Sequence, residues 1–70
     1  MHRFLGVIEK ASGNYSAYSQ DLLGCIATGK SHEEAERNIH EEIQLHVQGL
    51  IEDGEAIPIS ESCAEYIAGP

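Results

Sequence analysis

The sequence predicts an α+β fold with the element order βββαβ, in which one long helix covers one face of a small sheet. Short apolar segments separated by glycine-containing turns fill the first thirty residues, which is typical of strands. Ser31 and Glu34 then form an S-x-x-E helix start signal before a long helical pattern. No repeat, linker or low-complexity stretch interrupts the chain, so we expect residues 1–70 to form a single domain.

Three strands are predicted ahead of the helix. Residues 3–9 alternate in a way that gives the first strand apolar side chains on both faces. Turn residues at 12–14 lead to a second strand at 15–19, so these two strands are expected to form a hairpin. A connection at 21–24 precedes a short third strand at 25–28.

The helix is predicted to run from His32 to Asp53. Gly54 is expected to end it in the left-handed conformation, and Pro58 prevents its continuation. Spacing at 100° per residue predicts one apolar stripe facing the sheet. Its members are Ala35, Ile39, Ile43, His46, Val47 and Leu50. A helix of this length reaches about 30 Å, whereas a six-residue strand spans about 20 Å, so part of the helix should overhang the sheet.

A fourth strand is predicted near the end of the chain, at residues 63–68. Ala64, Tyr66 and Ala68 alternate there with the other side chains. Because a long helix separates this segment from the hairpin, it can lie parallel to an earlier strand through a right-handed crossover.

One helix cannot cover both faces of the sheet, so association between copies is expected. Leu5 and Val7 occupy the second face of the first strand. Leu45 lies off the helix stripe, and Gly49 follows one turn later on the same flank, where a glycine lets another backbone approach. We therefore predict a homodimer or higher homo-oligomer whose interface contains these four residues.

The charge of the chain narrows the range of partners. Twelve acidic residues against four basic ones give a formal net charge of -8. Nucleic-acid binding depends on Lys and Arg neutralising phosphates, and the four basic residues here are scattered. Direct binding to DNA or RNA is therefore not expected, and a basic protein is the favoured partner.

Targeting signals and cysteine spacing favour the cytoplasm. The first ten residues lack the long apolar core of a signal peptide, and no apolar run is long enough to cross a bilayer. Cys25 and Cys63 have neither a CxxC nor a Cys/His spacing, so we expect reduced thiols in a cytoplasmic protein without membrane insertion.

No catalytic, metal or cofactor site is expected. The first strand offers only Glu9 as a potential metal carboxylate, and the remaining acids concentrate on the helix as a solvated face. Two pairs with i,i+4 spacing, Glu36 with His40 and Glu42 with His46, supply only two ligands each. The simpler interpretation has His40 solvated and His46 packed along the apolar stripe. Catalysis by this chain is accordingly not predicted.

Seven short motifs in a fixed order resemble the HicB-like antitoxin family. They are Gly13-x-Tyr15, Asp21-Leu22-x-Gly24-Cys25, Thr28-Gly29, Ser31-x-x-Glu34-Ala35, Asn38-Ile39, Glu42-Ile43 and Asp53-Gly54-x-x-Ile57-Pro58. Each motif alone is weak, but their order and spacing over most of the chain are fairly specific.

The resemblance implies a partial ribonuclease-H-like fold and the role of antitoxin in a type II toxin–antitoxin pair. The implied partner is a HicA-like toxin, a small basic protein that cleaves messenger RNA and whose active site the antitoxin masks. An acidic chain suits such a partner electrostatically. The alternative is an orphan HicB-like binding or assembly module without a toxin.

This sequence differs from the family pattern in two places. The family turn often reads Pro-Asp-Leu-Pro-Gly, whereas Gln20 and Leu23 replace the two prolines here, so a more mobile loop is expected. Longer members continue into a DNA-binding segment, and this chain is expected to be a short form that does not bind an operator by itself.

The residues predicted to contact the toxin come from the second strand, the following turn and the helix surface. They are Tyr15, Tyr18, Asp21, Leu22, Glu33, Glu36 and Glu41. The two tyrosines should point to opposite faces of their strand, and aromatic side chains are enriched at interface hot spots. The alternative is that both tyrosines simply cover the sheet.

Overall fold

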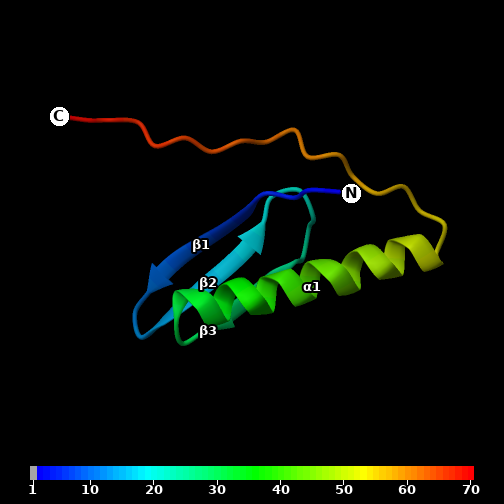
Figure 1. Ribbon diagram of the computed structural model, residues 1–70, viewed down its shortest axis with the longest axis horizontal. Helices are drawn as coiled ribbons and strands as arrows, with labels where there is room; N and C mark the ends of the chain where they lie inside the picture. The colour runs from blue at the N-terminus through cyan, green and yellow to red at the C-terminus, as the bar shows by residue number, and fades with distance from the viewer. Residues whose placement is uncertain (1) are drawn as a thin grey trace.

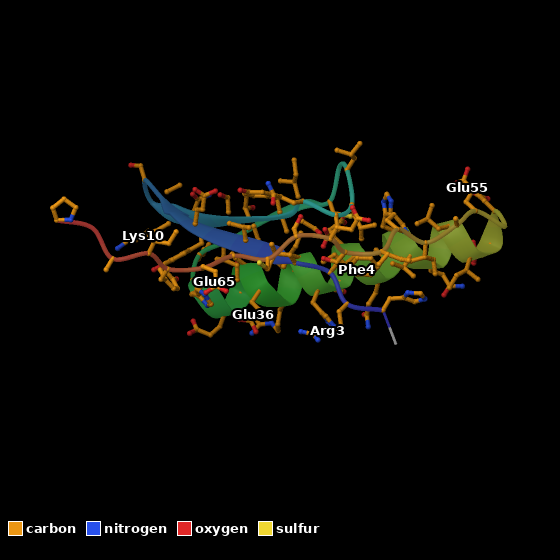
Figure 2. The ribbon with its side chains drawn as sticks, turned by 90° about the horizontal axis from the view of Figure 1, so that it is seen from above. Arg3, Phe4, Lys10, Glu36, Glu55 and Glu65 are labelled. Carbon is orange, nitrogen blue, oxygen red and sulfur yellow. The ribbon has the colours of Figure 1, made fainter. Side chains whose placement is uncertain are left out.

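The computed structural model describes residues 2–70, which form a three-stranded sheet and one helix. β1 (Gly6–Ala11), β2 (Asn14–Ser19) and β3 (Ile26–Gly29) are antiparallel neighbours in the order β1-β2-β3. α1 (His32–Glu52) lies along one face of this sheet, so sheet and helix form two layers (Figures 1 and 2). The predicted α+β arrangement of three strands followed by a long helix is confirmed.

The hairpin between β1 and β2 turns at Gly13, whose φ of 83° lies in the left-handed region that favours glycine.

β1 begins three residues later than the sequence predicts. The reason is a competing hydrogen bond, because the backbone amide of Leu5 donates to Oδ2 of Asp21 at 2.7 Å. The chain before Gly6 is therefore attached to the β2–β3 loop and not to the ladder.

The start of α1 has the predicted cap with one difference in its geometry. The Ser31 hydroxyl accepts a hydrogen bond from the Glu34 amide at 3.1 Å, as a capping residue does. The Glu34 carboxylate accepts from the amide of Lys30 at 3.1 Å and not from that of Ser31. Both bonds use amide groups that have no partner inside the helix, so they hold the connection between β3 and α1.

The end of α1 is a Schellman motif built on Gly54. The Gly54 amide donates to the carbonyl oxygen of Ile51 at 3.1 Å, and the Glu55 amide donates to that of Leu50 at 2.9 Å. Gly54 has a φ of 67°, which confirms the prediction that it ends the helix. Asp53, predicted as the last helical residue, is the C-cap.

The core lies between α1 and the sheet face that carries Ile8, Ala17 and Ala27, which are cross-strand partners. Small side chains on this face allow a close approach of the helix. At Gly29 the approach is between backbones, since a Cβ there would collide with the backbone of Ala35. The buried apolar residues are Ala17, Leu22, Cys25, Ala35 and Ile39.

The second half of α1 extends past the ends of the strands (Figure 1), which agrees with the expected overhang. The buried residues of the helix, Ala35 and Ile39, both lie in its first half. His46, expected to pack along the apolar stripe, is exposed, and this expectation was wrong. Its stripe neighbours Ile43 and Val47 do pack against the core, so His46 lies at the margin of the stripe, where its imidazole stays in water.

The predicted fourth strand at residues 63–68 is not formed. Residues 55–70 contain no strand, and they run on the β1 side of the molecule in the same direction as β1 (Figure 1). Ile59, Tyr66 and Ile67 are more than four-fifths exposed. With these large side chains exposed, the segment buries too little apolar area to offset the roughly 1–2 kcal/mol per residue that backbone ordering costs.

Candidate partner-binding surface

The sheet face opposite α1 carries a row of three apolar side chains. Val7 pairs with Tyr18, and Tyr18 pairs with Ile26, so all three point away from the helix. Val7 and Tyr18 are half-buried by their neighbours, while Ile26 is 65% exposed. The adjacent row on this face is polar and contains Ser16 and Thr28. The apolar row is thus a stripe across one end of an otherwise polar face.

Ile26 connects this row to a depression beside the β2–β3 loop. Leu23, which is 90% exposed, is the most accessible of the apolar residues that line it. The loop presents Leu23 outward because Gly24, with a φ of 84°, reverses the chain immediately afterwards. The lining residues are Tyr18, Ser19, Gln20, Leu23, Gly24, Cys25, Ile26 and Ser62.

A groove between β3 and α1 continues from Ile26 on its other side. Leu45, which is 68% exposed, supplies the apolar contribution of the helix. The Asn38 side chain donates a hydrogen bond to the carbonyl oxygen of Thr28 at 2.8 Å and so ties the two walls together. The β3–α1 groove is lined by Ile26, Ala27, Thr28, Asn38, Glu41, Glu42 and Leu45.

The charge of the β3–α1 groove is negative. Glu41 and Glu42 are exposed on its helix wall, and none of its lining residues is Lys or Arg. The effect reaches the core, where burial raises the pKa of the Cys25 thiol and the Glu42 carboxylate raises it further. Apolar side chains bordered by carboxylates suit a partner that is both apolar and basic.

These three neighbouring features meet at Ile26 and form one surface, which we call the Ile26 surface. Its apolar members are Val7, Tyr18, Leu23, Ile26 and Leu45, and its acidic members are Glu41 and Glu42.

The β2–β3 loop that supports this surface is anchored at both ends. Asp21 binds the Leu5 amide at 2.7 Å and its own amide donates to the Ser19 hydroxyl at 3.3 Å. Leu22, only 1% exposed, inserts into the core. The loop thus has contacts to Leu5, to Ser19 and to the core at positions other than those of the family prolines. The prediction that Leu22 is a surface residue was wrong, because the loop turns its neighbour Leu23 outward instead.

The two tyrosines of β2 point to opposite faces, as predicted. Tyr15 packs against the core cluster and makes an edge-on contact with the His32 ring, with centroids 6.3 Å apart. Tyr18 lies in the apolar row of the open face. Of the two, only Tyr18 belongs to the Ile26 surface, and Asp21 lies in the supporting loop.

The three glutamates predicted to contact a partner are exposed but lie in different places. Glu41 lines the β3–α1 groove, whereas Glu33 and Glu36 do not. Glu36 lies 3.7 Å from the His32 ring, a helix i,i+4 pair that is charged only when the histidine is protonated. The structure therefore brings one of these three acids together with the apolar side chains.

The residues predicted for an interface between copies are not on a separate surface. Val7 and Leu45 were predicted to contact a second copy, whereas Tyr18 and Glu41 were predicted to contact the toxin. In the structure Val7 pairs directly with Tyr18, and Leu45 lines the same groove as Glu41. Leu5 is half-buried near the amino-terminal end of β1. One continuous surface thus contains residues expected for a toxin and residues expected for a second copy.

Sequence reasoning missed the residue at the centre of this surface. Ile26 was part of the predicted third strand, but its face was not assigned. Cys25 and Ala27 pack toward the core, so alternation along the strand places Ile26 on the open face. Leu23 and Glu42 were also not predicted to belong to this surface, because their exposure depends on how the loop and the helix pack against the sheet.

Two further properties bear on function. Among residues 2–70, no three His, Cys, Asp or Glu side chains gather where they would hold a metal ion. In the same part of the chain, no helix combines the length and apolar character needed to span a membrane.

The fold and its open face define a small acidic α+β domain with one covered and one uncovered sheet face. Residues 4–70 match the family described as the HicB_like antitoxin of bacterial toxin-antitoxin systems. The chain belongs to this HicB-like antitoxin family, which confirms the resemblance found in its motifs.

Similar proteins come from a phage and from bacteria. An uncharacterized 14.9 kDa protein from the rep-hol intergenic region of Haemophilus phage HP1 is 36% identical over 63 residues, which cover 90% of this chain and 47% of that protein. A UPF0150 protein of Helicobacter pylori is 49% identical over 47 residues, covering 67% of this chain and 65% of its own length.

A UPF0150 protein of Synechocystis is 34% identical over 59 residues, covering 83% of this chain and 75% of its own length. The chain thus spans about half of the phage protein and about two thirds of the Helicobacter protein. No solved structure is significantly similar to the chain.

Proposed function

We propose that this chain is the cytoplasmic antitoxin of a type II toxin–antitoxin pair and acts by binding, without catalysis of its own. Its partner is a HicA-like, basic, messenger-RNA-cleaving toxin, which it neutralises by covering the toxin's active site. The observation that carries the proposal is the Ile26 surface, where exposed apolar side chains border two carboxylates and no basic side chain lines the groove.

Physical chemistry supports this assignment in two ways. A net charge of -8 attracts a basic protein and raises the rate of encounter at low ionic strength. The exposed apolar side chains at the centre can supply the affinity that charge alone does not, since buried apolar and aromatic anchors dominate most interfaces. Membership of an antitoxin family points in the same direction.

The test is co-expression with the product of an adjacent gene that encodes a short basic protein. We expect that protein to arrest growth when expressed alone, the antitoxin to restore growth, and the two to co-purify. Failure of the pair to co-purify together with failure to relieve the arrest would sink the antitoxin proposal. The absence of any such neighbouring gene would favour an orphan binding module.

A matched pair of variants tests whether the Ile26 surface is used. Ile26→Lys places a charge at the centre of the surface, while Ile59→Lys places the same charge on a residue that is 83% exposed outside it. Only Ile26→Lys is expected to lose rescue of growth, with weakening of binding by about tenfold or more, as at a hot spot. Equal behaviour of the two variants would exclude the Ile26 surface.

We also propose that the free protein is a homodimer, because the row of Val7, Tyr18 and Ile26 would otherwise remain open to water. Light scattering of the purified protein across micromolar concentrations measures this directly. A monomeric mass throughout that range would contradict it.

A further inference from the structure

Gly49 has no structural reason to be a glycine within this chain. It lies in the second half of α1, where glycine costs stability relative to alanine because it gains more freedom when the chain unfolds. A Cβ built on it would meet nothing within 4 Å. Gly29 is different, since there the packing of α1 on β3 leaves no room for a Cβ.

Gly49 continues a ridge of the helix that borders the β3–α1 groove. Glu41, Leu45 and Gly49 are spaced four residues apart and so follow one another along the same flank. The first two line the groove, where Leu45 is 68% exposed and faces Ile26 across it. The ridge therefore has a charge at one end, an apolar side chain in the middle and a notch at the other end.

This pattern suits a second helix lying against the flank. Helices pack by placing the ridges of one into the grooves of the other, and small residues at the contact allow the two axes to approach to about 8 Å. An apolar side chain of the incoming helix would contact Leu45 and Ile26, and its backbone would approach at Gly49.

Charge decides what kind of helix fits. A second copy of this chain would add its own Glu41 and Glu42 to a groove that is already negative, with no lining Lys or Arg to relieve the repulsion. A helix that carries Lys or Arg beside its apolar stripe meets complementary charge instead. The sequence-based assignment of Leu45 and Gly49 to a homodimer interface is therefore disfavoured on electrostatic grounds.

We propose that the flank of α1 from Glu41 to Gly49 is the docking site for a basic amphipathic helix of the partner protein. This inference rests on the proposed function and deepens it, because it specifies which element of the chain is contacted and which chemistry the partner presents.

Substitutions at Gly49 test the close approach separately from folding. Gly49→Ala and Gly49→Gln add side chains of increasing size in open space, and both residues favour the helix. We expect the Tm of the free protein to rise, while the affinity for the co-purified basic partner falls progressively, by about tenfold for Gly49→Gln. A rise in Tm with unchanged affinity would overturn the proposal.

Leu45→Lys tests the apolar contact, and Ile51→Lys is its control. Leu45 is 68% and Ile51 56% exposed, and Ile51 is absent from the groove lining. Leu45→Lys should weaken binding about tenfold or more, and Ile51→Lys about twofold or less. Since both positions are exposed, neither variant is expected to unfold. Equal losses from the two variants would contradict the proposal.

The charge contribution is tested by salt dependence. Glu41→Gln with Glu42→Gln removes two charges from the groove, and Glu33→Gln with Glu36→Gln removes two from outside it. Both double variants reduce the net negative charge equally, so both should flatten the dependence of the association rate on ionic strength, but the first should flatten it more because its two charges lie in the groove. If the wild-type protein binds the partner but the two double variants show the same salt dependence of the association rate, this inference is wrong and the proposed function stands. If the wild-type protein does not bind the partner at all, the proposed function is wrong as well.

Discussion

The two halves of α1 differ in how closely they pack against the rest of the molecule. In the first half, Ala35 and Ile39 are 0% and 5% exposed and pack on the sheet. In the second half, Leu45 and Ile51 are more than half exposed, and Gly49 has open space beside it. The fully buried helix residues thus all lie in the first half, while the second half combines half-buried side chains on its sheet-facing stripe with exposed apolar side chains on its flank.

This difference follows from the length of α1 and from the helix face on which each residue lies. α1 has 21 residues, whereas β1 and β2 have six each and β3 has four. At about 1.5 Å per helical residue the helix is longer than the sheet it covers, so its last turns extend past the strands. In its second half Ile43 and Val47, on the stripe that faces the sheet, still pack against the core, whereas Leu45 lies off that stripe and is exposed. An exposed apolar position beyond the sheet contributes little to folding, which leaves it available for binding.

Truncation of one residue in each half should show the contrast most strongly. Ile39→Ala leaves a cavity in the core and should lower the free energy of unfolding by about 2–4 kcal/mol, whereas Leu45→Ala should change it by about 0.5 kcal/mol or less. Urea unfolding followed by circular dichroism measures both values. Comparable losses would mean that Leu45 is also part of the core.

Adding a methyl group to the two glycines should have effects of opposite sign. Gly29→Ala forces a Cβ to within 2.9 Å of the Ala35 Cα and is expected to cost about 1–3 kcal/mol. Gly49→Ala meets no atom and should stabilise the free protein by up to about 1 kcal/mol. Thermal unfolding of the two variants measures both effects, and loss of stability in both would show that the space beside Gly49 is not open.

Removing the cap of the first half should have an intermediate effect. Ser31→Ala deletes the acceptor for the Glu34 amide and should destabilise the protein by about 1 kcal/mol. Ser31→Asp keeps an acceptor and adds favourable charge at the helix start, so it serves as the control. Hydrogen exchange of the first-turn amides would localise the loss, and unchanged protection in Ser31→Ala would contradict the role of the cap.

The smallest structural effect, but the clearest chemical one, is expected at the two cysteines. Both are free, with Cys25 buried in the core and Cys63 exposed after the helix. Burial and the Glu42 charge raise the pKa of the Cys25 thiol, so little thiolate forms at neutral pH. We expect a thiol reagent at pH 7.5 to label Cys63 rapidly and Cys25 only after denaturation. Simultaneous labelling in the native state would contradict this burial.

The elements that the sequence predicts well are those determined by neighbouring residues. Ser31 with Glu34 starts the helix within one turn, and Gly54 ends it through bonds to Leu50 and Ile51. The start of β1 was predicted too early because the Leu5 amide binds Asp21, sixteen residues away. A contact of that separation leaves no periodic trace in the local sequence.

The candidate site was predictable only in part for the same reason. Tyr18 and Val7 were found because alternation along a strand assigns each residue to a face. Leu22 was predicted to be exposed, but Leu23 is the exposed leucine. Which of the two points outward depends on the path of the loop, which is fixed by the contact of Asp21 with Leu5 and by the core. That Glu41 and Leu45 share a groove with Ile26 depends on where α1 crosses β3.

The sequence by itself therefore determined the order of three strands followed by a helix, the caps of α1, the acidic charge and the family to which the chain belongs. These properties arise from residues within a few positions of one another or from simple composition. Only the tertiary structure decided that residues 63–68 stay outside the sheet, that Leu22 is buried and that Val7, Tyr18, Ile26 and Leu45 share one surface. Burial depends on which elements cover one another, and that requires contacts between residues far apart in the chain.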